Sequence, residues 1–313
     1  MPPSHFGEKT TAQEAADYYS DKIKGKVVLI TGGSPGGLGA EAARVIALHE
    51  PKLIILAGRS KANIDRAMKE IQSETPSAPL RPLLIDLACL SNVREASKEV
   101  LAYEETIDVL INNAGIMGLE HYTKTVDGYE AQFATCHLGH FLLTGLIRPR
   151  LAANCRIVNV SSRGHVCGPV RFDDINFSEG KDYDPWLGYG QAKTANMLFS
   201  VELKKRWNVP TFSLHPGGIM TNLARNLSLE HKKSAGIIDE EGNRKVGDSE
   251  SKDVPQGTST HIVAAFDDDI LESNGGYLED CQLANDVARE YALSGENAAK
   301  LWEMSEKLVG EKF

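Results

Sequence analysis

The sequence predicts a single doubly wound α/β domain, in which a parallel seven-stranded sheet carries helices on both faces. Short aliphatic runs alternate with longer helical stretches, and the chain has no internal repeat. A strand that is buried on both faces of a parallel sheet is expected to be aliphatic throughout. The runs that fit this description are Val27–Ile30, Leu53–Leu56, Leu83–Ile85, Val109–Ile111, Ile157–Val160, Thr211–Leu214 and, more weakly, Tyr277–Leu278.

Helices are expected between these strands, over residues 38–49, 62–73, 91–104, 127–150 and 188–206. Ahead of the first strand, Thr11 and Glu14 have the spacing of a capping box, which predicts a short helix running towards Tyr19. We therefore expect residues 1–25 to form an N-terminal helical extension and residues 26–313 to form one domain. Residues 222–254 are polar and charged, which predicts an insertion that is either a substrate lid or an exposed surface loop.

Composition excludes several classes of function. The 313 residues include 34 Lys and Arg against 43 Asp and Glu, so the net charge is −9. An acidic chain lacks the basic surface that nucleic-acid backbones require, and we expect no nucleic-acid partner. The apolar runs are far shorter than the ~18 residues of a membrane helix, and no secretory signal is evident. Five cysteines without paired spacing indicate reduced thiols and a cytoplasmic location. The acidic cluster Asp267–Asp269 is interpreted as solvated surface.

A glycine-rich turn follows the first predicted strand. It reads Thr31-Gly32-Gly33-Ser34-Pro35-Gly36-Gly37-Leu38-Gly39 and opens an alanine-rich helix. Glycines let the backbone approach a pyrophosphate, and the helix N-terminus supplies amide donors and a positive dipole end. The turn could also be a simple strand–helix connection, but its position between strand and helix favours binding of a dinucleotide. Candidate contacts are Gly32, Ser34, Gly37 and Leu38.

The end of the second predicted strand indicates which dinucleotide is bound. An acidic residue in this region normally holds a ribose 2′-hydroxyl, whereas a 2′-phosphate requires an arginine. The chain has Gly58-Arg59-Ser60-Lys61 here, without an acid. Arg59 can make bidentate, charge-assisted hydrogen bonds with a phosphate. The alternative is a solvated Arg–Lys pair, and we favour NADP(H) over NAD(H).

Tyr189 and Lys193 are spaced i,i+4, so a helix would place the phenol and the ammonium on one face. A nearby ammonium favours the phenolate, and we therefore expect the pKa of Tyr189 to be lowered towards neutrality. Ser162 ends the fifth predicted strand, where its hydroxyl can hydrogen-bond a substrate oxygen that changes charge. A YxxxK pair is common by chance. Tyr189 and Lys193 are therefore stronger evidence of an active site because Ser162 occurs with them.

With these motifs, the sequence resembles the short-chain dehydrogenases/reductases from about Lys24 to Phe313, which implies a Rossmann-type fold. It is more closely similar to the retinol-dehydrogenase-like branch and to its fungal members. The matching elements are the turn Thr31–Gly39, Asp86-Leu87, Asn112–Gly115, His137–Thr144, Ser162, Tyr189 and Lys193, His215–Thr221, and Gly276–Cys281.

The resemblance implies a role for each matching residue. Tyr189 would be the general acid/base, Lys193 would lower its pKa and hold the nicotinamide ribose, and Ser162 would polarise the carbonyl. The remaining cofactor contacts would be Asp86 and Leu87 at the adenine ring, Asn113, Ala114 and Gly115 at the adenine ribose, and Pro216 and Gly217 with the carboxamide clamp Ile219 and Thr221. Residues 26–313 would then be a dinucleotide-binding and catalytic domain.

The sequence departs from the family pattern twice. The glycine-rich turn is one residue longer than usual, and we expect its glycines to absorb the insertion. Cys136 stands where the family has an Asn that is thought to hold a water linking the catalytic Lys to solvent. A thiol is a weaker hydrogen-bond partner, so proton supply is expected to be slower or rerouted, unless Thr135 or His137 compensates. Cys136 and His140 also have metal-ligand spacing, but no third ligand is evident and we expect no metal.

These observations predict an NADP(H)-dependent oxidoreductase that interconverts a carbonyl and an alcohol, most readily by ketone or aldehyde reduction. The loop between Ser162 and Tyr189 is rich in apolar side chains, which either bind a bulky hydrophobic, secondary-metabolite-like substrate or only pack the loop against the domain, and the sequence supports both interpretations equally. Two alternatives stay open: isomerase or cyclase chemistry in the same pocket, and a sensor or scaffold that binds NADP(H) without turnover. The family often forms dimers or tetramers, and the sequence gives no interface signature. The apolar loop residues are Phe172, Phe177, Tyr183, Trp186 and Leu187.

Overall fold

The computed structural model describes residues 2–3, 5–219, 230, 233, 239, 241 and 251–313. Within them the main sheet has the strand order β10-β9-β6-β5-β4-β1-β2-β3, and β7 and β8 form a separate parallel pair. The strands are β1 (Val27–Thr31), β2 (Leu53–Gly58), β3 (Leu80–Leu84), β4 (Ile107–Asn112), β5 (Leu151–Val160), β6 (Thr211–His215), β7 (Gly218–Ile219), β8 (Ser251–Lys252), β9 (Tyr277–Glu279) and β10 (Gln282–Leu283).

The predicted doubly wound fold is confirmed, with a correction to the number of strands. The main sheet of the described residues has eight strands rather than seven, and β10 pairs with β9 in antiparallel orientation. Asp280 and Cys281 form the tight turn between them, with φ of 51° and 63°. Because β10 is only two residues long, it leaves no aliphatic run in the sequence. The remaining neighbours in this sheet pair in parallel.

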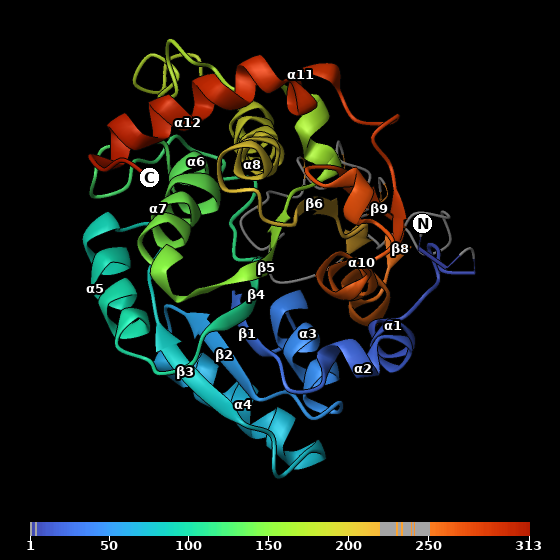
Figure 1. Ribbon diagram of the computed structural model, residues 1–313. Helices are drawn as coiled ribbons and strands as arrows, with labels where there is room; N and C mark the ends of the chain where they lie inside the picture. The colour runs from blue at the N-terminus through green and yellow to red at the C-terminus, as the bar shows by residue number, and fades with distance from the viewer. Residues whose placement is uncertain are drawn as a thin grey trace.

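Helices cover both faces of the sheet (Figure 1). One face packs against α1, α3, α4 and α10, and the other against α5, α7, α8 and α12. In the described parts of the chain, no helix is both long and apolar enough to cross a bilayer. The α-helices are α1 (Ala12–Tyr18), α2 (Ser20–Ile23), α3 (Leu38–Ala47), α4 (Lys61–Glu74), α5 (Leu90–Leu101), α6 (Ala131–Phe133), α7 (Gly139–Leu146), α8 (Pro185–Trp207), α10 (Val254–Phe266), α11 (Glu290–Leu293) and α12 (Gly295–Val309).

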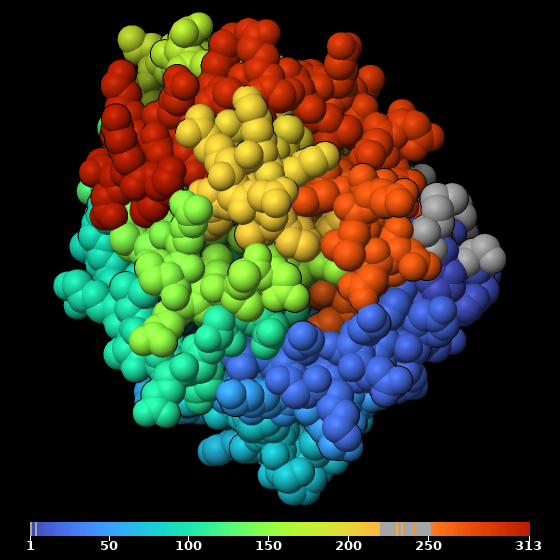
Figure 2. Space-filling model, viewed as in Figure 1, coloured from blue at the N-terminus to red at the C-terminus, as the bar shows by residue number. Residues whose placement is uncertain are grey.

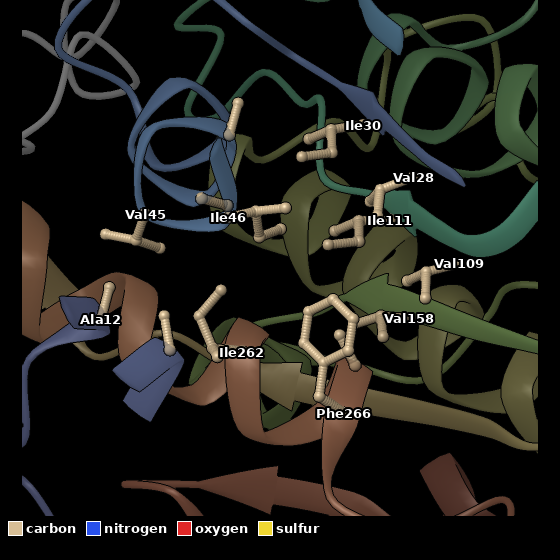
Figure 3. Packing of buried hydrophobic residues seen from close by; sticks show 14 of the residues in the cluster. Ala12, Val28, Ile30, Val45, Ile46, Val109, Ile111, Val158, Ile262 and Phe266 are labelled. Atoms are coloured by element: carbon tan, nitrogen blue, oxygen red, sulfur yellow. The ribbon is translucent and has the colours of Figure 1, made fainter. Parts of the chain in front are cut away.

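The core on the α10 side of the sheet joins segments that are distant in sequence. Figure 3 shows Val28, Ile111 and Val158 of three neighbouring strands facing Ile262 and Phe266 of α10. The same cluster includes the buried alanines of α1. The capping box at the start of α1 is present, because the Thr11 hydroxyl accepts from the Glu14 amide at 3.2 Å and the Glu14 carboxylate accepts from the Thr11 amide at 2.7 Å. In Figure 2 the N-terminal segment (blue) borders the segment that contains α10 (orange).

Several predicted boundaries differ from the structure, and those of β3, β5 and α8 are examples. β3 lies at Leu80–Leu84 instead of Leu83–Ile85, because an edge strand with partly exposed residues need not be aliphatic throughout. β5 begins six residues earlier than predicted, at Leu151. α8 begins at Pro185, where the Asp184 side chain caps the amides of Trp186 and Leu187. The helices α10 and α12 were not predicted. In the case of α10 the reason is its burial over nearly its whole length, because a buried helix lacks the polar face that marks a surface helix.

The helix predicted over residues 127–150 is wrong as a single element. It is divided into α6, a π-helical turn at Ala134–Leu138, α7 and a 3₁₀ turn at Arg148–Arg150. The helical segment starts only at Ala131, because the Glu130 carboxylate accepts from the backbone amides of Gln132 at 2.9 Å and Phe133 at 2.7 Å. Glu130 therefore fixes the beginning of the segment that carries Cys136.

Glu130 should make stability depend on pH. Burial raises its pKa to about 7, although the two amide hydrogen bonds act in the opposite direction. Between pH 4.5 and 7 the folded chain then holds a proton that the unfolded chain has lost, so stability falls as pH rises through this window. Glu130→Gln cannot ionise and should remove this fall, which amounts to about 3 kcal/mol at ~1.4 kcal/mol per pKa unit.

Urea unfolding of both proteins at pH 5 and at pH 8 measures the effect. The stability of wild type relative to the variant is expected to drop between the two pH values. Equal pH dependence in the two proteins would show that Glu130 has the same protonation in the folded and unfolded chains.

Candidate active site

The strand order reverses between β1 and β4, and the carboxyl ends of these strands hold the first group of predicted residues. The Thr31 hydroxyl accepts from the amides of Asn113 at 2.9 Å and Ala114 at 3.0 Å. The Asn113 side chain donates to the Thr31 carbonyl at 2.8 Å. Gly32 has φ of 82°, and a Cβ there would lie 2.7 Å from the Asn113 amide nitrogen. The close approach of the two loops thus requires glycine at position 32.

The glycine-rich turn leads directly into the N-terminus of α3. Gly37 is the N-cap of α3 and supplies no side-chain hydrogen bond to the helix. Gly36 has φ of 70° and lies in open space, which accommodates the extra residue of the turn. Ser34 is exposed, and Leu38 is half-buried. Uncapped amides at the N-terminus of a ten-residue helix fit the phosphates of a dinucleotide.

Arg59 and Asp86 lie beyond the carboxyl ends of β2 and β3. Arg59 is exposed directly after β2, while its neighbour Ser60 accepts from the Asn63 amide at 3.3 Å and caps α4. The Asp86 carboxylate accepts from the Ala88 amide at 3.0 Å, and Leu87 is buried. The structure thus leaves the Arg59 guanidinium accessible to an anion, next to the edge of the sheet that carries the glycine-rich turn.

Ser162, Tyr189 and Lys193 are brought together at the end of β5. The Ser162 hydroxyl accepts from the Gly164 amide at 3.0 Å, and a Cβ on Gly164 would lie 3.4 Å from its oxygen. The Lys193 ammonium is buried, lies 5.5 Å from the centre of the Tyr189 ring, and donates to the Val160 carbonyl at 2.9 Å. A Cβ on Gly164 would lie 2.6 Å from the Tyr189 ring, so only glycine allows this approach.

The expected lowering of the Tyr189 pKa is not found. Burial raises the pKa of Tyr189 above its ordinary value of 10.0, although the Lys193 charge and the Ser162 hydrogen bond both lower it. The loss of hydration of the phenolate outweighs the attraction of the ammonium because the phenol is almost wholly enclosed. The phenol is therefore protonated at neutral pH.

Cys136 lies in the π-helical turn, fully buried, beside the same lysine. Its Sγ donates to the Ile116 carbonyl at 3.5 Å. A Cβ on Gly115 would lie 3.3 Å from this sulfur and 3.6 Å from the Lys193 nitrogen, so the three residues are close neighbours. Burial raises the pKa of the Cys136 thiol despite the Lys193 charge. The thiol is accordingly neutral at physiological pH.

The two residues suggested to compensate for Cys136 behave differently. His137 is turned away, with its Nε2 bonded to the Ser305 hydroxyl of α12 at 2.8 Å and its ring among aromatic side chains. The Thr135 hydroxyl is buried and has no hydrogen-bond partner among the described residues. Both ring nitrogens of His140 are hydrogen-bonded, and no group of three or more metal-ligating side chains occurs in the described parts of the chain.

Pro216 and Gly217 follow β6 and lead into β7, which ends at Ile219. Gly217 has φ of 97°, and a Cβ there would lie 2.6 Å from Lys252, whose buried ammonium forms an ion pair with Asp280 at 2.5 Å. The Ile219 side chain lies against α10, because a Cβ on Gly257 would meet it at 2.0 Å. Thr221 and nearly all of the predicted lid at 222–254 lie outside the described residues. At its end, residues 251–252 form β8 and Val254 begins α10.

The apolar loop between Ser162 and Tyr189 divides into packed and exposed parts. Phe177 is buried against Tyr183, and the Tyr183 hydroxyl donates to the Leu119 carbonyl at 2.9 Å, so both rings hold the loop down. Leu187, near the start of α8, and Val166, in the 3₁₀ turn Arg163–Cys167, remain 40% and 44% exposed.

The sequence analysis missed His165, which supports Ser162. Its Nδ1 bonds the Ser162 carbonyl at 2.8 Å, and its Nε2 accepts from the Arg289 amide at 3.2 Å. Nδ1 therefore carries the proton, and the ring links Ser162 to the C-terminal segment. The only signal in the sequence was the three-residue spacing from Ser162.

Comparisons with known proteins identify the family of this chain. The family model for short chain dehydrogenases matches residues 26–172. Short-chain dehydrogenase/reductase prx1 of Penicillium roqueforti is 36% identical over 92% of this chain and 86% of its own length. Retinol dehydrogenase 12 of Mus musculus is 34% identical over 92% of this chain and 88% of its own. A crystal structure of an uncharacterized protein from Mycobacterium paratuberculosis has a TM-score of 0.72 and 31% identity over 93% of this chain and 96% of its own. The chain belongs to the short-chain dehydrogenase/reductase family, as its sequence motifs predicted.

Proposed function

We propose that this oxidoreductase reduces a ketone or aldehyde to an alcohol with NADPH, and that the same residues serve the reverse oxidation. The observation that carries the proposal is the enclosed Tyr189 phenol, which shares its surroundings at Gly164 with the Ser162 hydroxyl and lies beside the buried Lys193 ammonium. A protonated phenol that is held against a second hydroxyl is the arrangement that an acid catalyst of carbonyl reduction needs.

The proposed mechanism assigns one task to each of the three residues. The Ser162 and Tyr189 hydroxyls both donate to the substrate carbonyl oxygen and stabilise its developing negative charge. Tyr189 then transfers its proton to that oxygen as the alcohol forms. The Lys193 charge stabilises the phenolate that is left behind, which counteracts its burial. The bound cofactor supplies the hydride.

The cofactor would be held along the carboxyl edge of the sheet. The glycine-rich turn would bind the pyrophosphate, through Gly32, Ser34, Gly37 and Leu38, and Arg59 would bind a 2′-phosphate. The other proposed contacts are Asp86, Leu87, Asn113, Ala114 and Gly115 on the adenosine side, and Tyr189, Lys193, Pro216, Gly217, Ile219 and Thr221 on the nicotinamide side. NADP(H) is favoured because Arg59 is exposed and its segment has no carboxylate for a ribose hydroxyl.

A bulky apolar substrate is favoured by Leu187 and Val166, whose side chains stay exposed near Tyr189. Phe177 and Tyr183 do not support it, since they pack the loop. The non-redox alternatives have less support, because a neutral Cys136 is not a ready nucleophile and a cofactor sensor has no use for a positioned phenol. The direct test is NADPH consumption with a panel of lipophilic aldehydes and ketones. Binding without consumption across the panel would contradict a reductase.

Replacing Tyr189 by Phe should lower turnover by about 10²–10⁴-fold, because the change removes the proton donor and little else. The dissociation constant of NADPH, measured by fluorescence titration, should stay within a factor of about three of wild type. The variant Tyr291→Phe, which removes a hydroxyl that bonds the His165 carbonyl, is the matched control for loss of a tyrosine hydroxyl.

The pH–rate profile of the wild type adds a second measurement. Because the Tyr189 pKa is raised, the phenol keeps its proton across neutral pH, and reduction should lose this acid only above pH 10. Oxidation needs the phenolate and should increase as pH rises. A reduction rate that falls between pH 6 and 8 because Tyr189 loses its proton would contradict its assignment as the acid with a raised pKa.

Arg59→Ala should raise the KM for NADPH roughly tenfold to a hundredfold, the range for one charged hydrogen bond, while the KM for NADH hardly changes. Steady-state kinetics with both cofactors measure this difference. Arg66→Ala removes an exposed arginine of the next helix, paired with Glu70 at 3.9 Å, and is the control. An equal rise in the KM for NADPH and for NADH would show that Arg59 does not bind the 2′-phosphate.

Cys136→Asn should give a folded enzyme that is at least as fast as wild type. An amide donates to the Ile116 carbonyl more strongly than a thiol does, and it would order a proton-relay water better. The solvent isotope effect on turnover should change, because only proton-dependent steps are affected. Cys136→Ser adds no volume and serves as the control for packing. If both variants lose turnover but bind NADPH normally, the thiol has a role of its own.

A further inference from the structure

His140 connects two parts of the site that are far apart in sequence. It is the second residue of α7, directly after the π-helical turn, and its side chain is 2% exposed. Its Nε2 lies 2.8 Å from the Thr31 hydroxyl at the end of β1. Its Nδ1 lies 3.0 Å from the carbonyl of Cys136 in the π-turn. One ring therefore joins the glycine-rich end of β1 to the turn beside Lys193.

The chemistry of the two partners fixes the tautomer. A carbonyl oxygen can only accept, so the proton lies on Nδ1 and is donated to Cys136. The bare Nε2 then accepts from the Thr31 hydroxyl. Burial, with a smaller contribution from the Lys193 charge, lowers the pKa of His140 to about 4, so the ring is neutral at physiological pH. The neutral ring hydrogen-bonds the Thr31 hydroxyl and the Cys136 carbonyl at the same time, and it does not transfer protons during turnover.

The Thr31 hydroxyl is saturated as a result. Its one proton is donated to His140, which leaves both lone pairs directed at the amides of Asn113 and Ala114. The other acceptor near this hydroxyl is the Ile111 carbonyl, at 3.5 Å. Without an acceptor at His140, the hydroxyl would turn to this more distant oxygen, and its lone pairs would no longer face both amides.

We propose that His140 is a positioning residue that couples the loop at Asn113 and Ala114 to the π-turn beside Lys193. The inference rests on the proposed function, in which these two segments hold the cofactor and support the proton donor. Through Thr31 the ring fixes the loop, and through the Cys136 carbonyl it fixes the turn. The two segments are thus held in one geometry by a single buried side chain.

His140→Phe tests the inference, because it keeps a ring of similar size and removes both polar atoms. The dissociation constant of NADPH should rise about tenfold, the effect of one buried hydrogen bond. The KM for the carbonyl substrate should change much less, since no substrate contact is altered. His140→Gln retains a donor and an acceptor at the end of its side chain and should recover most of the affinity.

A double-mutant cycle with Thr31 separates coupling from a general loss of stability. Thr31→Val removes the hydroxyl, and in that background His140→Phe should weaken NADPH binding little further. Thr31→Ser retains the hydroxyl and should bind like wild type. Additive losses, or a lower Tm with unchanged NADPH affinity, would overturn the coupling. Should His140→Phe fail to fold, equal affinities of the Thr31→Val and Thr31→Ser proteins would overturn it as well.

The readout also distinguishes this inference from the proposed function. A wild-type chain that binds neither NADPH nor NADH would overturn the proposed function itself. A wild type that binds NADPH and a His140→Phe protein with the same affinity would overturn only the role of His140.

Discussion

The ammonium of Lys193 is a buried positive charge, and the chemistry around it follows from the cost of holding it there. Its bond to the Val160 carbonyl offsets part of that cost. Nearby groups respond to the same charge. His140, His215 and His261 have pKa values lowered to about 4, 3 and 3, chiefly by burial and in small part by the lysine. The Lys193 cation thus lies among neutral histidines, and it stabilises the ionised form of the Tyr189 phenol.

The elements that could be predicted are those whose signal is local. The aliphatic strands, the capping box at Thr11 and the glycine-rich turn each depend on residues adjacent in sequence. The i,i+4 spacing of Tyr189 and Lys193 likewise placed both on one helix face. The pKa of Tyr189 could not be predicted, because desolvation depends on everything that encloses the phenol.

Long-range contacts account for the other differences. The cluster Asp267–Asp269 reads as solvated surface in the sequence, yet Asp267 is buried and Asp268 forms ion pairs with Lys22 and Arg156. The Arg156 guanidinium also donates to the carbonyls of Ala264 and Asp267, at 3.2 and 2.7 Å. No spacing rule reveals a partner more than a hundred residues away. The π-turn is a separate case, because the bond from His140 Nδ1 to the Cys136 carbonyl spans only four residues and the sequence pattern of a continuous helix does not reveal it.

The two N-terminal helices share their hydrophobic cluster with the rest of the molecule. Ala12, Ala15 and Ile23 are completely buried in the cluster that contains α3 and α10, and the Lys22–Asp268 pair ties the end of this segment to the loop after α10. Side chains that share one core gain and lose their packing together. Residues 12–23 therefore belong to the cooperative unit of the domain, and their amide hydrogens should exchange with solvent as slowly as those of α10. A protein shortened at residue 25 would expose an apolar face of α10 to water and would be prone to aggregation.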